Sequence, residues 1–189
     1  MDYFVMEGQE VEAYLDDFGS ELTRRGFIDP IDILVVGGTY MVMKLSNRPA
    51  TEDIDFMFLG DKLDLTKLPL TKQEREFRAA IKAVAKRKNL KQTWLNDDAG
   101  PFVKEYVSEP VRVYWRSFGP LNVYFTDNAT MLVYKLMGFS PKQKPDVYAL
   151  AQALQVSSYE EVKAIVDRLV AEKTQGEFRV DETIEDLFE

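Results

Sequence analysis

Two aspartates at alternate positions of a short apolar segment are the residues of this sequence with the clearest chemical potential. Asp53 and Asp55 flank Ile54 in the stretch 53–59, DIDFMFL, whose other residues are typical of a strand. Because side chains alternate between the two faces of a strand, both carboxylates are expected on one face. Like charges so close together are unfavourable unless a cation lies between them. The spacing therefore predicts a divalent-ion site that phosphate oxygens and water complete.

A pair of glycines precedes these aspartates and strengthens the prediction. Gly37 and Gly38 follow the run 31–36, which is apolar except for Asp32, and Thr39 opens a segment of helical pattern. Backbone N–H groups at such a helix start are open to phosphate oxygens, because glycine has no side chain to block them. A glycine pair alone is more often a tight turn, and an isolated aspartate pair more often lies on a solvated strand face. Together with Arg48 in the intervening loop, the residues favour a site for phosphate and its metal ion.

The composition limits the chemistry that is open to the chain. The sequence has 189 residues, no cysteine, no histidine and a formal net charge of −8. Disulfides, the usual zinc sites and catalysis by cysteine or histidine are therefore excluded, which leaves hard, oxygen-bound ions such as Mg²⁺, Mn²⁺ or Ca²⁺. The acidic N-terminal stretch lacks the pattern of an export signal, and no apolar run has the length of a membrane helix. We expect a cytoplasmic protein with no membrane partner.

Hydrophobic periodicity predicts an α/β fold with a mixed sheet of the α+β kind. Capping-box spacings at Thr71 with Glu74 and at Ser158 with Glu161 mark two helix starts. Expected helices cover 9–25, 39–46, 71–89, 128–139, 145–155 and 158–172, expected strands cover 31–36, 53–59, 111–116 and 121–125, and 177–189 is a short helix or a loose tail. The predicted organisation is an α/β core over 1–126 and a C-terminal helical region over 127–189 that packs on it.

The residues of the opening motif are similar to the signature G-G-[S/T]…R-x-x-T-x-D-I-D of the nucleotidyltransferase-fold superfamily. The matching positions are Gly37, Gly38, Thr39, Arg48, Thr51, Asp53 and Asp55. The branch that the chain resembles is the minimal prokaryotic one, which includes the AbiEii-type toxins of toxin–antitoxin systems and the related DUF6036-like nucleotidyltransferases. Two later stretches, WLND at 94–97 and MLVYKLM at 131–137, resemble segments of the same group.

The resemblance implies a nucleotidyltransferase that moves a nucleoside monophosphate from a nucleoside triphosphate (NTP) to an acceptor. Mg²⁺ or Mn²⁺ would be held by Asp53 and Asp55, and pyrophosphate would leave. Such catalysis consists mostly of positioning and charge neutralisation, so few residues are required. The implied nucleotide-binding residues are Gly37, Gly38, Thr39, Arg48 and Lys135. For Arg48 and Lys135, a role as a surface or helix-end charge stays open.

A third carboxylate, which active members of the superfamily commonly supply from a later strand, is the point at which this sequence departs. The strand 121–125 carries Asn122 at the expected place, and asparagine cannot accept a proton at neutral pH. Asp97, Asp98 and Asp127 are candidates to replace it. Asp97 is favoured by the resemblance and is the third predicted catalytic residue, whereas Asp127 precedes an apolar periodic run and is expected to cap a helix.

The acceptor stays open between RNA such as tRNA, a protein and a small hydroxyl compound. The segment 78–91 is rich in Lys and Arg and has no acidic residue, which suits either a solvated helix face or an RNA backbone. Trp94 and Trp115 suit either base stacking or core packing. A cognate antitoxin is a further expected partner. The alternatives are a degenerate nucleotide-binding regulator and a non-enzymatic interaction module that uses its acidic helical part.

Overall fold

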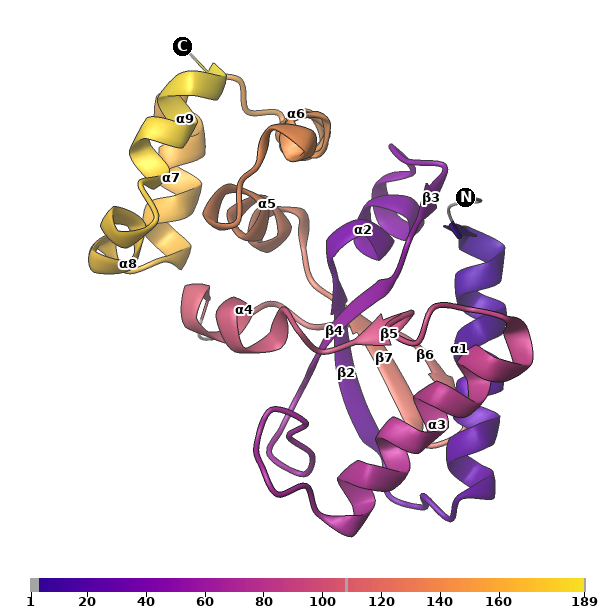
Figure 1. Ribbon diagram of the computed structural model, residues 1–189. Helices are drawn as coiled ribbons and strands as arrows, with labels where there is room; N and C mark the ends of the chain where they lie inside the picture. Colours follow the sequence, from indigo (N-terminus) through magenta and orange to yellow (C-terminus); the bar gives the residue numbers. More distant parts are fainter. Residues whose placement is uncertain (1–3, 108, 189) are drawn as a thin grey trace. The chain divides into compact units, whose positions relative to one another are not determined.

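The computed structural model describes residues 4–107 and 109–188, which form two compact units (Figure 1). The first unit runs to Gly100 and resumes at Arg112–Phe125, and the second contains Pro101–Val111 and the chain from Thr126 onward. The first unit contains the sheets, and the predicted mixed α/β class is confirmed. None of the helices in the described residues is long and apolar enough to cross a membrane.

The main sheet of the first unit has five strands in the order β5-β4-β2-β7-β6. Central β2 is antiparallel to β4 and parallel to β7, β5 is parallel to β4, and β6 is antiparallel to β7. The strands are β2 (Ile31–Val36), β4 (Ile54–Phe58), β5 (Leu95–Asn96), β6 (Val113–Phe118) and β7 (Leu121–Phe125). A second, two-stranded sheet pairs β1 (Met6–Glu7) with β3 (Ala50–Thr51). The sequence patterns did not predict β1, β3 or β5.

Two long helices, α1 (Gly8–Arg24) and α3 (Lys72–Lys88), lie side by side over one face of this sheet (Figure 1). Phe77 of α3 packs edge-on against Phe18 of α1 and contacts Phe56 of β4. Trp94 is fully buried in the same cluster and donates a hydrogen bond to the carbonyl of Ile81 at 3.1 Å. Trp94 is therefore a core residue, and its predicted alternative as a base-stacking side chain is wrong.

The segment after β2 is helical from the first glycine onward. Helix α2 (Gly37–Tyr40) continues without a break into a π-helical turn, η1 (Met41–Leu45), which ends at Ser46 with a left-handed φ of 52°. The predicted helix over 39–46 is thus present and begins two residues earlier. π-Helical turns are uncommon and occur frequently near functional sites.

The second unit consists of helices and their connections in its described residues. Its helices are α4 (Gly100–Tyr106, which begins at the last residue of the first unit), α5 (Asn128–Met137), the 3₁₀ helix η2 (Pro141–Gln143), α6 (Lys144–Leu154), α7 (Tyr159–Leu169), α8 (Glu172–Glu177) and α9 (Val180–Phe188). Asp127 caps α5 by accepting a hydrogen bond from the Thr130 N–H at 2.8 Å, as predicted. The C-terminal segment forms a helix over 180–188, whereas α4 was not predicted.

Candidate functional site

The glycine turn lies directly against the carboxylate of Asp55. Antiparallel pairing places Asp55 opposite Val36, so its side chain is beside the residue that follows, Gly37. A Cβ atom on Gly37 would lie 2.5 Å from Asp55 Oδ2, and the φ of Gly37 is +67°. Glycine is required here for two reasons, because a side chain would strain the backbone and collide with the carboxylate. The contact brings two separate parts of the sequence motif together.

The threonines of the motif fix the backbone that carries the aspartates. Thr39 Oγ1 and Thr51 Oγ1 both donate to the carbonyl oxygen of Asp53, at 2.9 and 3.1 Å. Both threonines are buried, so these hydrogen bonds are shielded from water. They tie the start of α2 and the short strand β3 to the entry of β4. The polar side chains of Thr39 and Thr51 therefore have a positioning role that the motif alone does not reveal.

Arg48 lies on the same side of the glycine turn as Thr51. A Cβ atom on Gly38 would be 2.5 Å from Thr51 Oγ1 and 3.8 Å from Arg48 Nη1. Arg48, Asp53 and Asp55 are half-buried, as are the two glycines, so the cluster has an exposed surface. We name this cluster, Gly37, Gly38, Thr39, Arg48, Thr51, Asp53 and Asp55, the glycine–aspartate site. All seven predicted motif residues belong to the first unit.

Asn96 is a site neighbour that sequence reasoning missed. The parallel pairing of β4 with β5 places Asp55 opposite Asn96, and directly opposed residues project from the same face. The amide of Asn96 is oriented by two hydrogen bonds at 3.2 Å, from Nδ2 to the Thr93 carbonyl and from the Asp98 N–H to Oδ1. The strand position opposite Asp55 is therefore occupied by a neutral amide residue. A strand of two residues is too short for periodicity to reveal it.

The assignment of Asn122 to the third-carboxylate position is wrong. The parallel register pairs Asn122 with Asp32 at the start of β2, and its Nδ2 donates to Asp32 Oδ1 at 2.7 Å. Asp55 pairs with Val36, four residues further along β2, which corresponds to about 13 Å at ~3.3 Å per residue. Asn122 therefore lies toward the opposite end of the strand from the glycine–aspartate site.

Asp97 follows Asn96 and is half-buried, whereas Asp98 is exposed. Burial raises the pKa of the Asp97 carboxyl above its usual value, the negative charge of Asp98 acts in the same direction, and the Arg78 guanidinium opposes the shift. A carboxyl with a raised pKa accepts a proton at neutral pH more readily than an ordinary aspartate does. Its position after the strand that borders Asp55 fits the predicted role of Asp97, which stays a prediction.

Lys135 belongs to the second unit, on α5. Its Nζ forms an ion pair with Asp146 Oδ2 of α6 at 3.0 Å, and the two side chains are 7% and 0% exposed. Each of these buried charges thus has an opposite charge as its partner, which a buried charge requires. The ion pair connects α5 with α6 inside the second unit. The predicted contact of Lys135 with phosphate stays a prediction.

The residue types of the glycine–aspartate site are those that Mg²⁺ prefers when substrate and water supply part of its coordination. Within residues 4–107 and 109–188, no group of three or more Asp, Glu, His or Cys side chains is placed to hold a metal ion by itself. Mg²⁺ commonly binds through one or two carboxylates, with phosphates and waters completing its octahedron. Asp53, Asp55 and the amide oxygen of Asn96 are hard oxygen donors of this kind.

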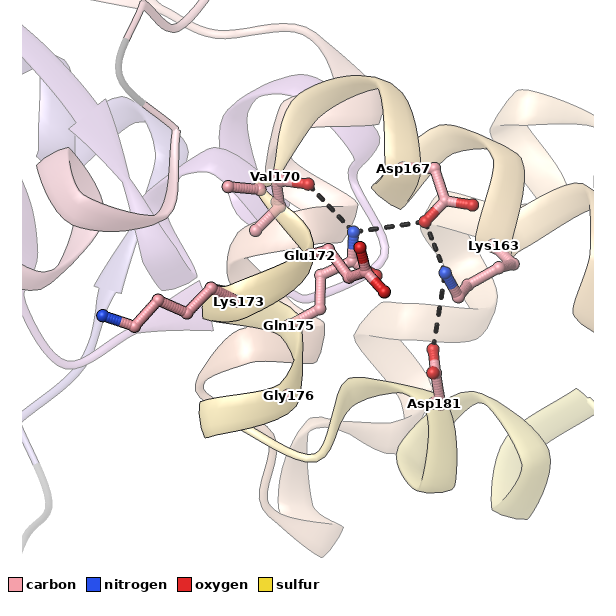
Figure 2. Close-up of a pocket in the computed structure, with 9 residues that line it drawn as sticks. Lys163, Asp167, Val170, Glu172, Lys173, Gln175, Gly176 and Asp181 are labelled. Atoms are coloured by element: carbon pink, nitrogen blue, oxygen red, sulfur yellow. Dashed lines mark hydrogen bonds and ion pairs between the residues drawn. The ribbon is translucent and has the colours of Figure 1, made fainter.

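A separate open pocket of about 910 Å³ lies among α7, α8 and α9 in the second unit (Figure 2). Lys163 Nζ pairs with both Asp167 and Asp181, and the buried Gln175 amide donates to Asp167 Oδ1 and the Val170 carbonyl, at 3.1 and 2.9 Å. These polar groups satisfy one another and connect the three helices. The pocket is therefore explained by the packing of this helical region, and we place the candidate site at the glycine turn.

Comparison of the chain with protein-family models, with curated proteins and with solved structures gave no match.

Proposed function

We propose that the glycine–aspartate site binds a nucleoside triphosphate with a divalent ion and that the protein is a nucleotidyltransferase. The observation that carries the proposal is the contact of the Gly37 backbone with the Asp55 carboxylate. This contact places the Gly37 backbone, which can bind phosphate oxygens, next to the Asp55 carboxylate, which can bind the cation that accompanies them.

Each residue of the site has a distinct proposed task. The backbone N–H groups of Gly37, Gly38 and Thr39 would receive the phosphate oxygens, and the Arg48 guanidinium would neutralise part of their charge. Asp53 and Asp55 would hold Mg²⁺ or Mn²⁺, with the Asn96 amide beside them. When bound, this ion would polarise the phosphates and stabilise the leaving diphosphate.

The proposed reaction forms one bond and breaks one bond at the α-phosphorus of the triphosphate. The oxygen of an acceptor hydroxyl bonds to this phosphorus, and the bond from the phosphorus to the oxygen that bridges it to the β-phosphate breaks. The hydroxyl proton passes to a base, for which Asp97, the residue that the resemblance favours, is the proposed group. Pyrophosphate leaves with the bridging oxygen, so atoms and charge balance.

The test is a thermal-unfolding measurement with each NTP in the presence of Mg²⁺, followed by transfer assays with α-labelled NTPs. Binding to the folded state raises the melting temperature, and the rise should vanish in Asp53→Asn with Asp55→Asn. Asp16→Asn with Asp29→Asn removes the same charge at exposed positions and is the matched control. No rise with any NTP and divalent ion, or an equal rise in both double variants, would refute the proposal.

A degenerate nucleotide-binding regulator is the second candidate function. Asn96 favours it, because the strand position beside Asp55 carries a neutral amide in place of a carboxylate. This candidate predicts NTP-dependent stabilisation without transfer of label to RNA, protein or a small hydroxyl compound. Detection of a labelled product that depends on Asp53 and Asp55 would eliminate it. A toxin-like role with a cognate antitoxin remains a proposal from the resemblance.

A further inference from the structure

The basic residues at the C-terminal end of α3 are neutralised by acidic residues from elsewhere. Arg87 Nη1 pairs with Glu21 of α1 at 2.6 Å, and Lys88 Nζ pairs with Asp17 of the same helix at 2.7 Å. These ion pairs connect α3 with α1. Part of the basic segment that the sequence revealed is thus structural.

A second group of basic residues on α3 faces solvent. These residues, which we name the α3 cation stripe, are Arg75, Arg78, Lys82 and Lys86. Their spacing of three or four residues aligns them along one side of the helix, and all four are exposed. The eleven steps from Arg75 to Lys86 correspond to about 16 Å at ~1.5 Å per residue.

The charges of the stripe form no ion pair among the described residues, although Arg78 lies near enough to Asp97 to oppose the rise in the pKa of that carboxyl. Arg75 Nη1 and Arg78 Nη2 donate to neutral backbone carbonyls, those of Leu70 at 2.5 Å and Leu65 at 2.6 Å. Lys82 and Lys86 make no ion pair within the described part of the chain. Four positive charges therefore stay in line on a chain whose formal net charge is −8.

The acidic residues of α3 do not interrupt the stripe. Glu74 is buried, where it accepts from the N–H groups of Asp64 and Thr71 at the helix start. Glu76 lies about 100° away around the helix from Arg75 and pairs with Arg25, the C-cap residue of α1, at 2.6 Å. The side of α3 that carries the stripe is thus positive and complements a regularly spaced polyanion.

The stripe and the glycine–aspartate site belong to the same unit. Arg78 lies near enough to Asp97 for its charge to act on that carboxyl, and Asp97 follows Asn96, the partner of Asp55. β5, which contains Asn96, is an edge strand of the sheet. A ligand on the stripe therefore needs only to pass around this edge to reach the site.

We propose that the α3 cation stripe binds the sugar–phosphate backbone of RNA, which is the acceptor of the transferred nucleotide. The acceptor role rests on the proposed function, whereas RNA binding itself can be measured without it. The choice of RNA follows from the stripe's charge and from the chemistry of transfer, because an RNA strand offers a 3′ hydroxyl and a 2′ hydroxyl at each nucleotide. In this assignment the stripe contacts the phosphates and makes no sequence-specific contact with the bases.

Fluorescence anisotropy of a labelled RNA of about 20 nucleotides tests the proposal, with the full chain and a series of salt concentrations. Lys82→Gln with Lys86→Gln removes two stripe charges, and Lys142→Gln with Lys173→Gln removes two exposed charges of the second unit. Both changes take the formal charge from −8 to −10, since each removes two positive charges. Loss of two phosphate contacts should lower the salt slope by about 1.4 and the affinity roughly tenfold at 0.15 M salt.

The expected result is this loss in the stripe variant and unchanged affinity in the control variant. Equal losses in the two variants, no measurable RNA binding, or equal or tighter binding of duplex DNA or anionic vesicles would overturn the proposal. The NTP-induced rise in melting temperature should persist in the stripe variant. If that rise is absent from the unmodified chain while RNA binding is present, the proposed function fails and the RNA surface stands.

Discussion

Replacement of Gly37 by alanine is the most direct perturbation of the candidate site. The new Cβ would lie 2.5 Å from Asp55 Oδ2, against an ordinary contact of 3.4 Å or more. The carboxylate must therefore retreat by about 1 Å, which its side chain can do by rotation. The φ of +67° adds a backbone cost of about 1–2 kcal/mol for any residue other than glycine.

The magnitude of the effect follows from these two terms. A loss of about 1–2 kcal/mol lowers the melting temperature of a chain of this size by roughly 2–8 °C. Displacement of a ligating group by about 1 Å can reduce a site's activity as much as 100-fold. We therefore expect Gly37→Ala to stay folded and to lose most of the stabilisation that an NTP with Mg²⁺ provides.

Gly26→Ala supplies the control for this experiment. Gly26 also has a positive φ, +84°, but its added Cβ would meet no atom within 4 Å. Its substitution should cost similar backbone strain and leave the NTP-induced rise intact. Differential scanning fluorimetry of both variants with and without NTP and Mg²⁺ separates strain from displacement. An equal NTP response in the two variants would refute the assignment of Gly37 and Asp55 to one site.

Three further substitutions test contacts within the first unit. The neighbouring Arg24, with Arg87 and Arg25, lowers the pKa of Glu21 to about 2, so the ionised Glu21 side chain stabilises the fold fully above about pH 4.5 and loses this effect as the pH falls toward 2. In urea unfolding, Glu21→Gln should therefore lower the free energy of unfolding by about 1–2 kcal/mol at pH 7 and by less at pH 3. A difference that does not change with pH would contradict this. Asn96→Asp adds a third carboxylate beside Asp55, and should lower the melting temperature without metal and increase its rise with Mg²⁺; an unchanged metal response would contradict the strand register. In Gly19→Ala the new Cβ would lie 2.1 Å from a β6 backbone oxygen, which should lower the free energy of unfolding in urea by about 1–3 kcal/mol. In the control Gly176→Ala the new Cβ would meet no atom within 4 Å, so the free energy of unfolding should not fall. Equal stabilities of the two variants would contradict the tight packing of α1 on β6.

The elements that the sequence predicted well are those whose own residues specify them. The largely apolar run at 31–36 became β2 with the predicted bounds, since its apolar residues are buried within the sheet. The capping box at Thr71 and Glu74 is formed, and α3 ends before Asn89, which adopts a left-handed conformation. Local rules apply in these cases because the backbone hydrogen bonds at a helix end are satisfied within a few residues.

The errors concern strand neighbours, which local patterns do not determine. Alternation showed that Asn122 faces away from the core positions of its own strand, but only the pairing with β2 shows that its neighbour is Asp32. The same kind of information places Asn96 beside Asp55. Strand register depends on contacts between segments that are distant in the chain. A single sequence therefore predicts which face of a strand a residue occupies, but not which residue of the neighbouring strand lies opposite it.

Burial of a charge was equally hidden from the sequence. Glu21 lies in the helical pattern of α1 beside Arg24 and Arg25, as a residue on a solvated face would. Its side chain is nevertheless 1% exposed, because Arg87 of α3 reaches across to complete its set of partners. A carboxylate can be buried where several guanidinium groups supply hydrogen bonds and opposite charge. The partner from α3 becomes visible only in the folded chain.

The arrangement of the first unit suggests how the two proposed ligands are brought together. Phe77 packs α3 onto one face of the sheet, whereas Asp55 and Asn96 project from the other. β5 is the edge strand around which one face of the sheet leads to the other, and Asp97 follows directly after it. In the proposed complex, RNA held on the cation stripe would carry its hydroxyl around this edge, past the carboxyl whose pKa burial has raised. The base takes the hydroxyl proton while the oxygen bonds to phosphorus, so the proposed complex requires this carboxyl within hydrogen-bond reach of the hydroxyl at the site itself.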